Sequence, residues 1–84
     1  MNNSDSVDIP YDRFQAWMKS TEMLGELGST LRHELDCFSK PPTRHQIERT
    51  ARAARAAEAS STGLARLLAC ALALSLENAA YEMG

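Results

Sequence analysis

The 84 residues are enough for one domain, near the size at which a single hydrophobic core is only just sufficient. Hydrophobic residues make up 44% and charged residues 24% of the chain, which is typical of a folded protein and excludes a low-complexity sequence. The formal net charge of −2 gives no overall electrostatic preference for nucleic acid or for an acidic membrane surface.

The first residues indicate where the domain begins and in which compartment it works. Residues 1–8 are polar and acidic, so we expect a flexible tail followed by a single helical domain over residues 9–84. This start does not resemble a secretory signal, and both Cys37 and Cys70 fall within helical patterns. We therefore expect reduced thiols and a cytoplasmic protein.

A first helix is predicted over residues 11–39, with Asp8 or Asp12 at its N-cap. Gly25 and Gly28 lie inside it and disfavour helix, which indicates either a close approach of another backbone or a bend. The alanine-rich sequence farther along the chain favours the close approach. The buried face is expected at positions that alternate by three and four residues: Phe14, Trp17, Thr21, Leu24, Gly28, Leu31, Leu35 and Phe38.

Pro41 and Pro42 end this helix, because proline lacks a backbone N–H and restricts the residue before it. Thr43 and Gln46 have the spacing of a capping box, so a second helix is predicted over residues 43–82. The short connection makes the two helices an antiparallel hairpin. Charge agrees with this pairing, since residues 1–39 carry seven acids and three bases, and residues 40–66 carry six bases and two acids.

The weak helix formers Ser60 to Gly63 leave two all-α architectures open. In the first, which the apolar spacing favours, the second helix is continuous or merely kinked, and the hairpin dimerises into a four-helix arrangement. In the second, the helix breaks at residues 60–63 and the chain forms a three-helix bundle that needs no partner.

The run LARLLACALALSL over residues 64–76 is apolar on nearly every face of a helix. Such a helix needs cover from several sides, and a small chain has little material for this, so we expect a homodimer. Arg66 interrupts the run, which is also shorter than the roughly 20 residues of a membrane span, so no membrane partner is expected. The predicted self-association residues are Leu64, Leu67, Leu68, Leu72 and Leu76, with Trp17 and Phe14 from the first helix.

A row of arginines on the second helix is the predicted partner-binding surface: Arg44, Arg49, Arg52 and Arg55. Such a row could follow a phosphate backbone or bind an acidic protein groove. The alternative is use within the chain, through pairs such as Glu48 with Arg52 and Arg55 with Glu58, and through the acidic first helix. The intramolecular interpretation is favoured because no aromatic residues interleave with the arginines.

The sequence predicts neither an enzyme nor a metal or cofactor site. His33 and Cys37 share a helix face, but a structural zinc site needs four ligands, and only His45 is a plausible third. A nucleophile and its base on one straight helix rarely converge on a substrate.

The function predicted from these features is binding of another protein, as an adaptor, inhibitor or chaperone-like protein that covers a surface of its partner. Nucleic-acid binding through the arginine row is the alternative. In size and hairpin pattern the chain resembles small accessory proteins of bacteria, temperate phages and secretion systems, including inhibitors of host proteins. This resemblance concerns architecture only and implies a mode of action without naming a partner.

Overall fold

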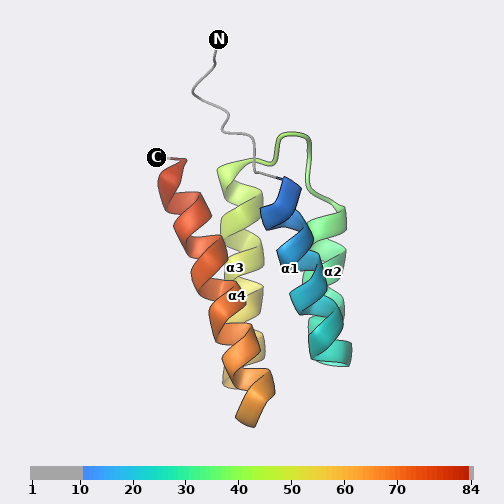
Figure 1. Cartoon of the computed structure of the whole chain (residues 1–84). Coiled ribbons are helices and arrows are strands. Elements are labelled where there is room, and N and C mark those ends of the chain that lie inside the picture. The colour runs from blue at the N-terminus through green and yellow to red at the C-terminus, as the bar shows by residue number, and fades with distance from the viewer. Residues whose placement is uncertain (1–10, 84) are drawn as a thin grey trace.

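The computed structural model describes residues 11–83, and these residues form helices without any strand (Figure 1). The predicted tail over residues 1–8 lies outside the described residues. In chain order the elements are α1 (Tyr11–Leu24), the 3-10 turn η1 (Gly25–Gly28), α2 (Ser29–Asp36), α3 (Arg44–Ala59) and α4 (Gly63–Glu82).

Successive helices run in opposite directions and form a small bundle (Figure 1). The rings of Phe14 and Phe38 are 6.3 Å apart, which places the start of α1 beside the end of α2. Trp17 Nε1 donates a hydrogen bond of 2.8 Å to Ser75 Oγ, so α1 packs against α4. α2 packs against α3, and α3 and α4 pair along most of their length.

The prediction of one continuous helix over residues 11–39 is wrong, because the chain reverses at Gly25. This glycine has a φ of +65°, a conformation that glycine adopts without steric cost and that ends α1. After the reversal Gly28 lies directly against the backbone carbonyl of Thr21, where a Cβ atom would overlap it. The predicted close approach therefore occurs, but within the first segment and together with a bend.

The capping box at the start of α3 forms as predicted, although the helix before it ends at Asp36 and not at residue 39. Thr43 Oγ1 accepts a hydrogen bond of 3.1 Å from the Gln46 N–H, and Gln46 Oε1 accepts one of 2.9 Å from the Thr43 N–H. Gln46 Oε1 also accepts bonds from the N–H and the hydroxyl of Ser39, at 3.1 and 2.9 Å. The Gln46 amide therefore connects Ser39 and Thr43 of the turn to the first turn of α3.

A long second helix over residues 43–82 is also wrong, because α3 ends at Ala59 and α4 begins at Gly63. Gly63 has a φ of +63°, and the hydroxyls of Ser60 and Ser61 donate to the carbonyls of Ala57 and Glu58. The alternative with a break at residues 60–63 is correct at this point. It missed the reversal at Gly25, so the described residues contain one more α-helix than the three-helix bundle and two more than the hairpin.

The core is built from a few large side chains and many alanines. Large apolar residues come from every helix, whereas most of the buried residues of α3 and α4 are alanines, whose small side chains let two backbones approach closely. Polar groups in the core are satisfied, as Thr21 and Thr50 donate to carbonyls of their own helices. The buried hydrophobic residues are Trp17, Leu24, Leu31, Leu35, Ile47, Ala51, Ala54, Ala57, Ala69, Leu72, Ala73, Leu76, Ala79 and Ala80.

Truncation of Leu72 tests this core. Its side chain is 2% exposed, so Leu72→Ala should lower the free energy of unfolding by about 2–5 kcal/mol through lost burial and a residual cavity. Leu67→Ala on the same helix is the matched control, because Leu67 is 67% exposed and its truncation should change stability by about 0.5 kcal/mol or less. Urea denaturation followed by circular dichroism measures both, and equal effects would contradict this placement of α4.

A substitution at Gly28 tests the reversal of the chain between α1 and α2. Gly28→Ala should destabilise the fold by about 1–3 kcal/mol, because the new Cβ forces α2 away from Thr21. Thr30→Ala, at an exposed position of α2, should leave the denaturation midpoint close to that of the parent. Unchanged stability of Gly28→Ala would mean that residues 25–28 do not form this reversal.

Candidate functional site

Four of the six large hydrophobic side chains that are exposed among the described residues lie on the outer face of α4. Its residues alternate by three and four positions, the spacing of one face of a helix that packs on another helix. Leu64 is 70% exposed, Leu67 67% and Leu74 48%, and Tyr81 is 82% exposed at the end of the helix. We call this set the outer α4 stripe; it consists of Leu64, Leu67, Ala71, Leu74, Asn78 and Tyr81.

The stripe is exposed because the neighbours of α4 lie on its other sides. The opposite face of α4 is buried in the core. One flank is fixed to α3 by Glu77, which binds Arg55, and the other flank to α1 by Ser75, which accepts from Trp17. The first residues of α4 extend past the reversal that follows α1, so no described helix covers the stripe there (Figure 1).

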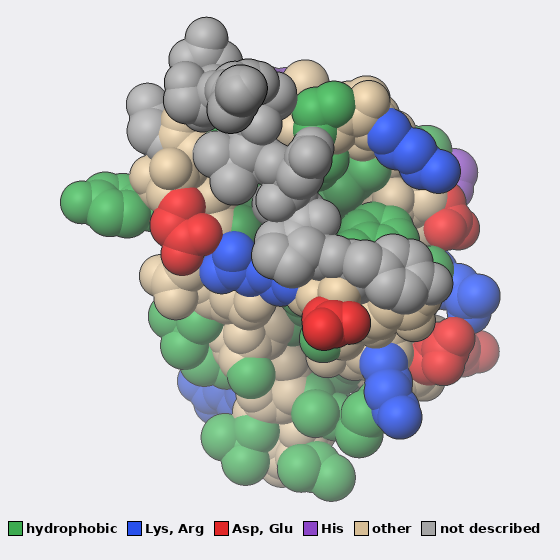
Figure 2. Space-filling view, turned by 45° about the horizontal axis from the view of Figure 1, so that its top comes forward, with side chains coloured by type: hydrophobic (Ala, Val, Ile, Leu, Met, Phe, Trp, Pro, Cys, Tyr) green, Lys and Arg blue, Asp and Glu red, His purple; other side chains and the backbone are tan. Residues whose placement is uncertain are grey.

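Further apolar side chains gather at the same end of the bundle. Met23 is 59% exposed and Leu27 39%. Since α1 and α4 are antiparallel and Trp17 contacts Ser75, Met23 lies about level with Ala69, in the first half of α4. Figure 2 shows hydrophobic side chains concentrated at this lower end of the molecule, away from most of the charged ones.

The residues that we predicted for self-association divide into two groups. Leu64 and Leu67 lie on the outer α4 stripe. Trp17, Leu72 and Leu76 are buried in the chain's own core, while Phe14 and Leu68 are partly buried against that core. The prediction left out Leu74 and Tyr81, although the regular spacing from Leu64 could have identified them.

The arginine row is mostly engaged by acids of the same chain. Arg55 Nε and Nη2 donate two bonds of 2.8 Å to the Glu77 carboxylate, and Arg55 Nη1 lies 2.9 Å from Glu58 Oε1. These hydrogen bonds raise the pKa of Arg55 and lower the pKa of both carboxyl groups. Arg55 therefore connects α3 to α4, and the expected pair with Glu58 is confirmed.

The other arginines differ in their partners. Arg44 binds Glu48 at 3.0 Å, so the expected pair of Glu48 with Arg52 does not form. Arg49 lies 3.4 Å from Glu34 and connects α3 to the acidic first segment, as expected. Arg52 is exposed and has no ion pair within residues 11–83.

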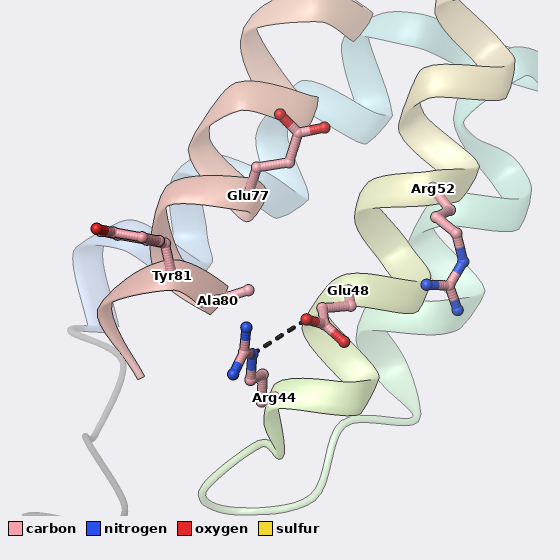
Figure 3. Close-up of a pocket in the computed structure, with 6 residues that line it drawn as sticks. All are labelled: Arg44, Glu48, Arg52, Glu77, Ala80 and Tyr81. Atoms are coloured by element: carbon pink, nitrogen blue, oxygen red, sulfur yellow. Dashed lines mark hydrogen bonds and ion pairs between the residues drawn. The ribbon is translucent and has the colours of Figure 1, made fainter. Parts of the chain in front are cut away.

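A shallow groove lies between the start of α3 and the end of α4 (Figure 3). It has a volume of about 380 Å³ and is lined by Arg44, Glu48, Arg52, Glu77, Ala80 and Tyr81. Its charged groups largely neutralise each other, since Glu48 is bound to Arg44 and Glu77 to Arg55. Arg52 points away from α4, so the groove does not concentrate positive charge (Figure 3).

The pair His33 and Cys37 is brought together, with Nε2 and Sγ 3.9 Å apart on the exposed side of α2. Within residues 11–83 no group of three or more histidine, cysteine or acidic side chains could hold a metal ion. His45, the suggested third ligand, is therefore not part of such a group.

α4 also has the length and composition of a membrane-crossing helix. Within its 20 residues, an 18-residue stretch has a mean hydropathy of 1.3, and 33% of that stretch is buried inside the bundle. Core helices of soluble proteins meet the same criterion, so this single helix is weak evidence for a membrane location.

The chain matches no protein-family model, no curated protein and no solved structure. The geometry of the described residues therefore carries the functional argument.

The Arg55–Glu77 pair predicts how stability depends on pH. Because the folded-state pKa of Glu77 is lowered from its ordinary value of 4.5, the pair stabilises the fold above that value. This contribution is lost as the pH falls through the lower folded-state pKa. Glu77→Gln should lower the Tm at neutral pH and weaken the fall in Tm on acidification, as measured by thermal denaturation.

Glu26→Gln is the matched control for Glu77→Gln. It removes the same charge from an exposed position that has no ion pair within residues 11–83. Its unfolding curve at neutral pH should follow that of the parent. Equal Tm values for the two variants would show that Arg55 and Glu77 do not connect the helices in solution.

Proposed function

We propose that this chain is a protein-binding helical protein, of the adaptor, inhibitor or chaperone-like kind, that acts by covering a surface of another protein. The observation that carries the proposal is the outer α4 stripe. Contiguous apolar surface on a small protein indicates an interaction site. The stripe offers three leucines and a tyrosine on one rigid helix, and the rest of the fold holds that helix in place.

The form of the surface also supports protein binding over catalysis. A helix face with anchors at every third and fourth residue fits a groove or another helix. Catalysis needs a concave site with converging polar groups. The groove in the described residues is shallow, and both of its carboxylates are held by arginines.

Nucleic-acid binding receives less support. Three of the four arginines in the row are bound to acids of the same chain, so binding phosphate would require these ion pairs to break. Arg52 alone is a small positive site compared with the several phosphate contacts of a nucleic-acid-binding surface.

The proposal is tested by capturing partner proteins with the tagged chain from a bacterial lysate, with and without nuclease. We expect a defined partner that survives nuclease treatment and is lost with Leu64→Glu/Leu67→Glu, because buried glutamates are costly at an apolar contact. Mass spectrometry identifies the partner, and circular dichroism checks that the variant is folded.

Ala56→Glu/Ala59→Glu is the matched control, since both alanines are exposed on α3 and have the same spacing and charge change. It should retain the partner. Equal loss with both variants would contradict a role for the stripe. Recovery of nucleic acid, with all protein lost on nuclease treatment, would overturn the proposal in favour of the arginine row.

A further inference from the structure

We propose that the outer α4 stripe is occupied in the free protein by the same stripe of a second copy, with the two α4 helices antiparallel. This inference rests on the proposed function, because it assigns the stripe as a protein-binding face and names what covers it when no other partner is present.

The first argument is the self-complementarity of the stripe. The stripe residues follow one another at alternating steps of three and four. In an antiparallel helix pair, a residue followed by a step of three faces a residue of the other helix that is followed by a step of four. When all six positions overlap, Leu64 lies opposite Tyr81 of the second copy, and Ala71 lies opposite Leu74 at the two-fold axis. A small residue thus meets a large one at the centre, which lets the helices approach closely.

The second argument is the polarity of α4. Glu77 is bound to Arg55 and Glu82 to Arg13 within the same chain, so the polarity that remains is the dipole of the 20-residue helix. Antiparallel pairing opposes the two helix dipoles. Parallel pairing would instead align them, which is unfavourable.

The third argument is the size of the contact. A helix of 20 residues is about 30 Å long and about 10 Å wide, so covering one side of it buries on the order of 500 Å² per copy. The total of about 1,000 Å² is at the lower limit for specific complexes. The dimer should therefore be reversible and sensitive to concentration, which leaves the stripe accessible to another protein partner.

The first test measures mass by sedimentation equilibrium of the full chain from the low micromolar to the millimolar range. The parent and Ala56→Glu/Ala59→Glu should convert from monomer to dimer as the concentration rises. Leu64→Glu/Leu67→Glu should stay monomeric throughout and keep the helical circular dichroism of the parent. A parent that is monomeric at every concentration would overturn the proposal.

The second test determines orientation by disulfide formation in a Cys37→Ala/Cys70→Ala background. A mixture of Leu64→Cys and Tyr81→Cys chains should form a mixed disulfide dimer, while neither variant should cross-link efficiently alone, because antiparallel pairing separates identical positions at the helix ends. Cross-linking of Leu64→Cys chains with one another would overturn the antiparallel arrangement.

The outcomes also separate this inference from the proposed function. A chain that is monomeric but captures a protein through the stripe disproves the second copy and leaves the proposed function standing. A dimer that captures no other protein supports this inference and contradicts the proposed function. Stripe-dependent flotation of a monomeric chain with phosphatidylcholine vesicles would assign the stripe to a lipid surface and overturn this inference.

Discussion

The contact of Gly28 with the backbone of Thr21 is the constraint on which the rest of the structure depends. The chain reverses at Gly25, and because Gly28 has no side chain the two halves of the first segment pack closely against each other. The resulting pair of helices is short and covers only part of the α3–α4 hairpin (Figure 1). The start of α4 consequently extends past this pair, and the outer α4 stripe lies exposed on the surface.

Electrostatics stabilise the same arrangement. Arg55 binds Glu77 on α4 and Glu58 on its own helix, and Arg49 binds Glu34 on α2. These pairs are partly exposed, so each contributes modestly to stability, but together they fix the neighbours of α3. Together with the pair of Arg44 and Glu48, they engage three of the four arginines of the row.

The two sides of α4 differ in how they are covered. The side of α4 that faces the core is rich in alanine and closely packed, whereas its outer side presents leucines to solvent. A surface of this kind is more costly in water than a polar one, and association with another helix or groove removes that cost. This cost is the physical basis of the proposed binding to another protein.

The sequence by itself determined the helical class, the turn at Pro41 and Pro42 and the capping box at Thr43, because these depend on local propensities and hydrogen bonds between near neighbours. The buried face of the first segment was also predictable from spacing, as Trp17, Leu31 and Leu35 are all buried. Only the tertiary structure decided that Gly25 reverses the chain and that α4 keeps Leu72 inside while it exposes Leu67. A run that is apolar on every face does not indicate which face the chain itself will cover; that depends on where distant helices end and pack.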